Sequence, residues 1–345
     1  MSSITENRPT EYESLDRLWR RGRDFLGSKL AILGGAMTWV SERNLVSALS
    51  NSGAFGVVAC GSMDSNTLDT EIAATQDLTD QPFGVNLIVM HPQLDALISV
   101  CSARKVTHVF LAGGMPRERI VKMVHDGGAK VIAFAPTLSI VKKFIRSGVD
   151  AIVIEGMEAG GHTGPVATSV LAQEILPNVR EVPIFVAGGI GRGDAMVSYL
   201  EMGASGCQIG TRFVCTRESV AHSNFKAAFL RAGARDAQLS IQADPDFPVI
   251  PVRAITNAAT QRFIETQRSV IARYRQGEIS QSDAQLEIEH FWAGALRRAV
   301  IEGDIENGSL MAGQSVGLVT SEQTVSELLE EMLGQALDHI QLNNY

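Results

Sequence analysis

The strongest constraint on the fold is a pattern that repeats eight times between about residue 30 and residue 213. Each repeat is a short apolar run rich in β-branched residues, followed by a glycine or polar turn and an amphipathic stretch. The runs begin at Leu30, Gly56, Phe83, Thr107, Lys130, Ala151, Ile184 and Gly206. Successive runs start roughly 20 to 35 residues apart, which is about the length of one strand–helix unit.

Eight buried strands that alternate with helices predict an α/β fold, the (β/α)8 TIM barrel. Strands of a parallel sheet that is covered on both faces are near-continuous apolar runs, and the eight segments have this character. An open, doubly wound sheet is the second possibility, because it uses the same alternation without closing.

The pattern changes after residue 213. Segments 217 to 232, 254 to 275 and 281 to 302 have helical periodicity, and the one strand signal between them lies around residues 248 to 252. A last helix is expected over residues 322 to 341, with an apolar face. These observations predict a disordered tail at 1–12, a barrel made of 13–215 and 306–345, and a mainly helical capping domain at 216–305.

Charge and composition exclude several classes of protein. The 345-residue chain carries a net charge of −8 that is spread along its length, whereas a nucleic-acid-binding protein usually has a basic stripe. No apolar run approaches the roughly 18 residues of a membrane span, and the first residues lack a secretory signal, so we expect a cytoplasmic protein with no membrane partner. The four cysteines have no CxxC pair and no histidine at ligand spacing, so we expect neither a metal site nor disulfides.

A histidine stands on a glycine-rich loop directly after the sixth apolar run. The loop covers residues 155–164 (EGMEAGGHTG) and carries His162. Glycines let the backbone adopt positive φ and let a flat ligand approach closely, so the loop can deliver one titratable side chain to an open site. The alternative is that His162 is a structural histidine satisfied by hydrogen bonds in a surface turn.

Two glycine turns follow the last two runs. Gly188 and Gly189 follow the seventh run, and Gly210 and Thr211 follow the eighth. In a barrel these loops often bind phosphate, because unpaired backbone N–H groups point toward the anion. The alternative is that the glycines only close tight turns. A dinucleotide-binding Rossmann fingerprint is a weaker interpretation of these glycines, because residues 189–193 (GIGRG) do not have the GxGxxG spacing.

Two further loops supply candidates for binding a ring. Met37 follows the first run on a small-residue loop and could pack on a planar group, although it could also belong to the core. Asn86 ends the third run with an amide that both donates and accepts, although it could instead cap a turn. Phosphate at the last two strands, an amide and a histidine at one mouth of a barrel are consistent with flavin mononucleotide.

Six motifs resemble those of the nitronate monooxygenase (2-nitropropane dioxygenase) family, which includes the FMN-dependent enoyl-acyl-carrier-protein reductases. The motifs are residues 37–40 (MTWV), 82–87 (PFGVNL), 155–162 (EGMEAGGH), 187–190 (AGGI), 210–213 (GTRF) and 311–314 (MAGQ). They occur in the family's order over nearly all of residues 30 to 335. The resemblance implies a barrel that holds FMN without a covalent link, with a second domain over the mouth.

The resemblance also implies roles for individual residues. It assigns the phosphate to Gly188, Gly189, Gly210 and Thr211, the ring to Met37 and Asn86, further cofactor contacts to Glu155, Gly160, Gly161 and Gln314, and catalysis to His162. The first loop departs from the family pattern. Gly34 stands where glutamine is common and Ala36 where glycine is common, so one flavin contact is not carried over.

The resemblance implies two reactions. In the first, an alkyl nitronate reduces FMN, dioxygen reoxidises it, and His162 acts as base or electrostatic partner. In the second, NAD(P)H reduces FMN and an enoyl thioester accepts the hydride. Nitronate oxidation is our first choice and enoyl-thioester reduction the alternative. A non-catalytic flavin-binding barrel is the third hypothesis, and a homodimer is compatible with each of them.

Overall fold

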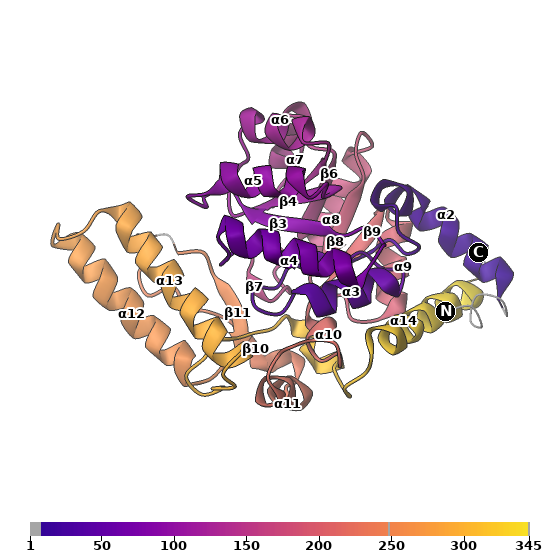
Figure 1. Ribbon diagram of the computed structural model, residues 1–345. Coiled ribbons are helices and arrows are strands. Elements are labelled where there is room, and N and C mark those ends of the chain that lie inside the picture. The colour runs from indigo at the N-terminus through magenta and orange to yellow at the C-terminus, as the bar shows by residue number, and fades with distance from the viewer. Residues whose placement is uncertain (1–7, 248, 344–345) are drawn as a thin grey trace.

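A computed structural model describes residues 8–247 and 249–343, and its centre is an eight-stranded parallel sheet (Figure 1). The strands are β1 (Ile32–Gly34), β2 (Val57–Ala59), β3 (Gly84–Ile88), β4 (His108–Ala112), β5 (Lys130–Phe134), β6 (Ala151–Glu155), β8 (Ile184–Ala187) and β9 (Gly206–Ile209). Each strand lies within or directly after one of the eight apolar runs, and the order in the sheet is β1-β9-β8-β6-β5-β4-β3-β2. The predicted strands are therefore confirmed.

The sheet closes on itself at β1. On one side β1 pairs with β9, with Ile32 opposite Cys207. On the other side Leu33 forms a parallel bridge with Phe55, where the amide of Gly34 donates to the Phe55 carbonyl over 2.8 Å. The fold is thus the predicted (β/α)8 barrel, and the open doubly wound sheet is wrong.

Neighbouring residues of each strand face opposite layers, because side chains alternate along a strand. Leu33, Val57 and Phe110 belong to a cluster inside the barrel, whereas Ile32 and Val58 belong to the larger cluster under the helices. The covering helices are α3 (Arg43–Asn51), α4 (Ser65–Leu78), α5 (Leu94–Ala103), α6 (Glu118–Asp126), α7 (Leu138–Arg146), α8 (Thr168–Ile175) and α9 (Gly193–Glu201), with a short α10 (Thr211–Val214) after β9. Burial on both faces explains the near-continuous apolar runs.

Two helices from the chain ends, α2 (Pro9–Leu26) and α14 (Val325–Leu342), pack together on one side of the barrel (Figure 1). Leu26 enters the cluster inside the barrel, so the end of α2 covers its amino-terminal opening. Of the tail predicted at 1–12, residues 1–7 lie outside the described residues, and residues 9–12 form the first turn of α2. The helix expected at 322–341 is α14, whose cap is Thr324.

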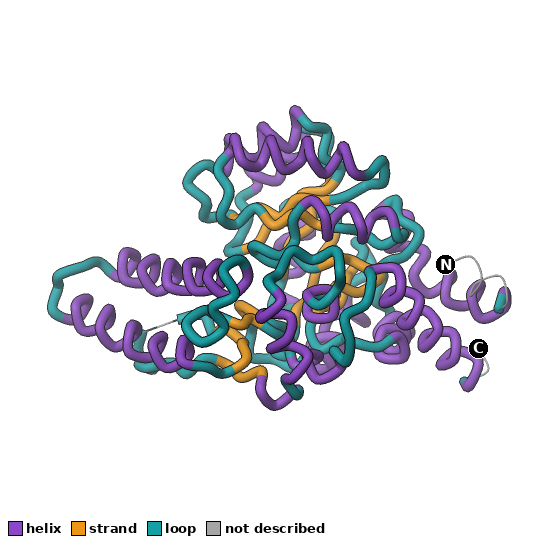
Figure 2. Tube along the Cα trace, turned by 60° about the horizontal axis from the view of Figure 1, so that its bottom comes forward, coloured by secondary structure: helices purple, strands orange, loops and turns teal. Residues whose placement is uncertain are grey.

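A second unit projects from the opposite side (Figures 1 and 2). It contains α12 (Ala258–Arg275) and α13 (Gln281–Val300), beside a small antiparallel sheet. The strands of that sheet are β10 (Ala237–Leu239), β11 (Val252–Ile255), β12 (Leu310–Met311) and β7 (Gly161–His162). The unit has its own apolar core, in which the rings of Phe263 and Trp292 lie 4.1 Å apart. We call residues 237–300 the helical module.

Part of the segment predicted as a capping domain packs with the barrel. The helix α11 (Ser223–Arg231) buries Phe225 and Phe229 in the large cluster under the barrel helices. The helix α13 joins both cores, because Trp292 lies in the module and Leu296 in the barrel cluster. Shared burial along one helix ties the module to the barrel. The boundaries 216 and 305 remain a prediction.

The contact between α9 and α14 yields a test of the packing. A Cβ on Gly193 would overlap the carbonyl oxygen of Met332, so we expect Gly193→Ala to lower the free energy of unfolding by about 1–3 kcal/mol. Gly334 lies on α14 with open space around its missing Cβ, so Gly334→Ala should raise stability by about 0.5–1 kcal/mol. Urea denaturation measures both changes. Equal effects would contradict the close helix contact.

Candidate functional site

A pocket of about 510 Å³ lies at the carboxyl ends of the barrel strands. The end of β3 and the loops after β1, β4, β5, β6, β8 and β9 line it. The rest of its wall comes from residues beyond the barrel strands: Val214, Phe225, Ile250, Leu296, Met311, Gly313 and Ser315. Since ligand sites of TIM barrels form at this face, the pocket is the candidate active site.

One end of the pocket offers backbone amides. Gly188 and Gly189 have φ of +99° and +74°, a conformation that favours glycine. Within the described residues, no hydrogen-bond acceptor faces the amides of Gly188, Gly189, Gly210 or Thr211. The hydroxyl-bearing side chain of Ser315 also lines this pocket and is buried. Gly210 and Thr211 lie at the start of α10, and together with the two glycine amides after β8 they form an anion-binding cradle.

The cradle is held by a carboxylate that does not itself line the pocket. Glu158 Oε2 accepts hydrogen bonds from the amide of Thr168 (2.9 Å) and from its hydroxyl (2.7 Å). The same hydroxyl lies 3.1 Å from the carbonyl oxygen of Gly188. The backbone carbonyl of Glu158 accepts the amide of Gln314 over 2.9 Å. Glu158 therefore joins the loops after β6 and β8 to the segment that carries Ser315.

The loop after β1 is fixed by a serine. Ser41 Oγ donates to the carbonyl of Gly35 over 2.7 Å and accepts the amide of Met37 over 3.0 Å. The amide of Ala59, at the end of β2, donates to the Ser41 carbonyl. These contacts set the direction of Met37 where the loop enters the pocket.

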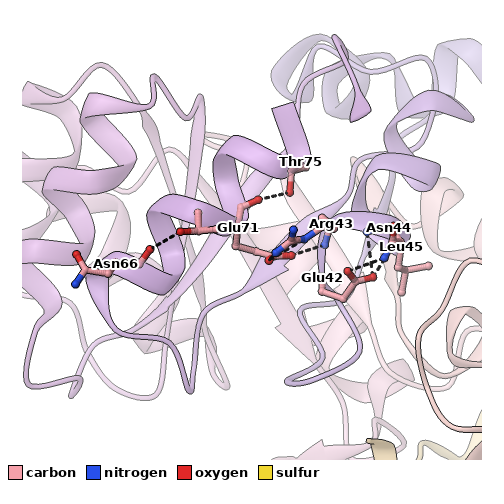
Figure 3. A network of polar contacts seen from close by, with 8 residues as sticks. Glu42, Arg43, Asn44, Leu45, Asn66, Glu71 and Thr75 are labelled. Atoms are coloured by element: carbon pink, nitrogen blue, oxygen red, sulfur yellow. Dashed lines mark hydrogen bonds and ion pairs between the residues drawn. The ribbon is translucent and has the colours of Figure 1, made fainter. Parts of the chain in front are cut away.

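A polar network holds the start of α3, directly after this loop (Figure 3). Glu42 caps the helix by accepting the amides of Asn44 and Leu45. Glu71 on α4 is buried and accepts both the backbone amide of Arg43 (2.6 Å) and its Nε (3.0 Å). Because α4 packs on the barrel, the network anchors the far end of the loop that carries Met37.

The floor of the pocket, at the barrel strands, carries two amide side chains. Asn86 on β3 and Gln208 on β9 are both more than nine-tenths buried. The Asn86 amide nitrogen lies 3.4 Å from the carbonyl of Phe110, and the structure shows no partner for the Gln208 amide among the described residues. Amide groups of this kind donate and accept, so they can match the polar edge of a heterocycle.

Glu155 ends β6 and lines the same pocket. Burial raises the pKa of its carboxyl group from 4.5 to about 7, and the nearby His162 lowers it in part. A carboxyl group with a pKa near neutrality, beside an imidazole in a pocket, can hold or release a proton under ordinary conditions.

His162 stands at the rim of the pocket, and its side chain is exposed. It lies in β7, which pairs antiparallel with β11 of the helical module, with Val252 opposite His162. Gly161, the other residue of β7, has φ of +79°. The catalytic candidate is thus held between barrel and module.

The structure gathers ten of the eleven predicted site residues around one pocket. They are Met37, Asn86, Glu155, Gly160, Gly161, His162, Gly188, Gly189, Gly210 and Thr211. Gln314 is not among the pocket-lining residues, whereas its neighbours Gly313 and Ser315 are. The prediction missed Ser315 and Gln208. Gln208 lies two residues before Gly210, at the strand end where inward-facing residues of a barrel meet a ligand, and this position could have indicated it.

Other kinds of site find no support in the described residues. All four cysteines are buried and free, and burial raises the pKa of each thiol, so none has thiolate character. No group of three His, Cys, Asp or Glu among residues 8–247 and 249–343 is placed to hold a metal ion. No helix in that part of the chain is long and apolar enough to cross a membrane.

The nitronate monooxygenase family model matches residues 21–97 and 93–335. The chain belongs to this family of oxidoreductases. The match includes every loop that lines the pocket, so the family assignment and the geometry concern the same part of the molecule.

Three known proteins illustrate the range of relatives. A (3aS,4S,5R,7aS)-5-hydroxy-7a-methyl-1-oxo-octahydro-1H-indene-4-carboxyl-CoA dehydrogenase of Mycobacterium tuberculosis (strain ATCC 25618 / H37Rv) is 28% identical, over 92% of this chain and 96% of the relative. A probable nitronate monooxygenase of Staphylococcus aureus (strain MRSA252) is 26% identical, over 88% of this chain and 94% of the relative. FabK from Thermotoga maritima, whose structure is known, is 32% identical in sequence with a TM-score of 0.83, over 94% of this chain and 98% of the FabK chain.

The raised pKa of Glu155 predicts a pH-dependent stability. Between pH 4.5 and about 7 the folded state keeps a proton that the unfolded chain releases, so the free energy of unfolding falls as pH rises through this window. Glu155→Gln removes the effect. We compare the free energies of unfolding of the variant and the wild type by urea denaturation of ligand-free protein. From pH 5 to pH 8 we expect the difference, variant minus wild type, to increase by about 1–2 kcal/mol. The exposed Glu174→Gln on α8 is the control, and a pH-independent difference for Glu155→Gln would contradict the assignment.

Proposed function

We propose that the protein is an FMN-dependent oxidoreductase. The observation that carries the proposal is the cradle of open amides at Gly188, Gly189, Gly210 and Thr211, at one end of a pocket whose floor carries two amide side chains. An anion cradle fits the phosphate of FMN, and backbone without Cβ atoms lets a flat ring approach closely. The amides of the floor fit the polar edge of the ring.

The residues present therefore fit the cofactor that the family resemblance implies. Gly188, Gly189, Thr211 and Ser315 would hold the phosphate, and Met37 would pack beside the ring. When bound, FMN would supply two-electron transfer to or from a substrate. The chain itself would bind, orient and move protons.

We further propose that the substrate is an unsaturated acyl thioester and that NAD(P)H is the electron donor. The part of the lining that comes from beyond the barrel strands is largely apolar and includes Val214, Phe225, Ile250, Leu296 and Met311. Such a wall suits an acyl group, whereas a small alkyl nitronate needs little apolar surface. The M. tuberculosis relative is named as a carboxyl-CoA dehydrogenase, which supports a thioester. Enoyl-thioester reduction therefore becomes our first choice, ahead of the nitronate oxidation that the sequence analysis preferred.

In this reaction His162 and Glu155 would act on the substrate. Hydride addition at the β-carbon places negative charge on the thioester carbonyl oxygen, and His162 at the rim could donate a hydrogen bond to it. The α-carbon then takes a proton, for which the carboxyl group of Glu155 is a source below its pKa of about 7.

Nitronate oxidation with dioxygen remains the second candidate. It is favoured by the description of the family model and by the S. aureus relative named as a probable nitronate monooxygenase. His162 beside the pocket would then face an anionic substrate. A non-catalytic flavin-binding barrel would leave turnover independent of His162.

Anaerobic mixing of the FMN-loaded protein separates these candidates. We expect NADH or NADPH to bleach the flavin and crotonyl-CoA to restore its colour, because the thioester accepts the hydride. Bleaching by propionate 3-nitronate alone, with no response to either nicotinamide, would instead favour nitronate oxidation. His162→Gln should slow reoxidation by the thioester about 100-fold while FMN remains bound. Unchanged turnover in this variant would contradict the role of His162, whereas a flavin that none of these compounds bleaches would favour the non-catalytic barrel.

A matched pair of variants tests the phosphate cradle. Ser315→Ala removes a buried hydroxyl at the pocket, so we expect FMN to dissociate more readily, with an affinity about fivefold lower. Gln314→Ala changes the neighbouring side chain, which does not line the pocket, and should leave the affinity unchanged. Quenching of flavin fluorescence on titration measures both. A larger loss for Gln314→Ala would restore the assignment based on the resemblance alone.

A further inference from the structure

We propose that Arg253, on β11 of the helical module, is a positioning residue that holds the His162 loop in place. Its side chain is only 3% exposed, although it carries a charge. Arg253 Nε donates to the carbonyl oxygen of Met157 over 2.8 Å, and Nη1 donates to the carbonyl oxygen of Ala237 over 2.5 Å. One guanidinium group therefore joins the His162 loop to β10 and β11.

The backbone of the same strand holds the tip of the loop. In the β7–β11 ladder, Arg253 lies opposite Gly161 and Val252 lies opposite His162. The amide of Thr163 donates to the carbonyl of Pro251 over 3.1 Å. Val252 is buried in the apolar core of the module, so the strand that pairs with His162 is itself anchored. The tip thus depends on the module for its position.

Segments outside the module fix the base of this loop and its middle at Glu158, but they do not pair with its tip at residues 161 and 162. Thr163 Oγ1 donates to the carbonyl of Gly156 over 3.0 Å, and the amide of Met157 donates to the carbonyl of Val166 over 2.8 Å. Between these contacts the loop contains Gly160 and Gly161, and glycine has the largest conformational freedom to lose on ordering. Without a partner for its tip, the loop would place the imidazole over a wide range of positions.

The chemistry of arginine suits the task. Guanidinium is planar and charged at all relevant pH values, and its nitrogens can reach two carbonyl groups that lie in different directions. Burial disfavours the charge and lowers the pKa of Arg253, whereas the carboxylate of Glu158 raises it. Glu158 also holds the anion cradle through Thr168. Arg253 and Glu158 therefore place the imidazole and the cradle relative to each other.

This proposal depends on the proposed function in one respect, which is that His162 is the residue whose position matters. The test is hydrogen exchange of the FMN-loaded protein, compared among wild type, Arg253→Met, Arg253→Lys and the exposed control Arg235→Met in the turn directly before β10. We expect Arg253→Met to speed exchange across residues 157–163 at least tenfold, with β4 and β5 unchanged. Arg253→Lys should give an intermediate effect, because ammonium keeps the charge but lacks the planar fork. The control should resemble the wild type.

Turnover separates positioning from a general structural role. We expect kcat of Arg253→Met to fall at least tenfold while FMN affinity changes less than threefold, with Arg253→Lys recovering part of the loss. Exchange at residues 157–163 that equals the wild type in both variants would overturn the proposal, as would equal acceleration over the whole barrel. If Arg253→Met does not fold, Arg253→Lys gives the same comparison. If His162→Gln keeps full turnover but Arg253→Met still loosens the loop, the catalytic role proposed for His162 fails and the positioning of the loop stands.

Discussion

Closure of the parallel sheet between β1 and its two neighbours is the constraint on which the site depends. The hydrogen bond from Gly34 to Phe55 on one side and the pairing of Ile32 with Cys207 on the other bring the carboxyl ends of all eight strands to one rim. Barrel loops from Gly35 to Thr211, which are far apart in sequence, then line one pocket. An open sheet that lacked the β1–β9 pair would leave the amides after β8 and β9 far from Met37.

Closure also explains why much of the fold and site could be predicted from sequence. Strands covered on both faces must be apolar throughout, so eight such runs were visible. A loop that follows a strand must end at the shared rim, so the positions of Asn86, His162 and Gly188 followed once the barrel was assumed. The assignment of particular atoms to a flavin came from the family resemblance, because composition and periodicity do not specify a ligand.

The features that sequence did not predict depend on contacts between distant segments. Pairing of Gly161 with Arg253 joins residues about 90 positions apart, and a two-residue strand has no periodicity to detect. Arg253 by itself resembles an ordinary charged residue at the end of a short apolar strand signal, and nothing in the sequence indicates that it is buried. Ser315 lines the pocket and the preceding residue, Gln314, does not. Both lie at the start of a short 3-10 turn, and the direction of that turn decides which side chain faces the pocket.

The two walls of the pocket have different origins, and this divides the chemistry between them. Barrel loops supply the backbone amides and barrel strands supply Asn86 and Gln208, and these groups suit a polar, phosphorylated cofactor. Segments beyond the barrel supply Ile250, Leu296 and Met311, which suit an apolar substrate. His162 belongs to both, because its loop leaves a barrel strand and pairs with β11. Changes in the module can therefore alter which substrate is accepted without disturbing the cradle, but only as long as β11 keeps its register with the catalytic loop.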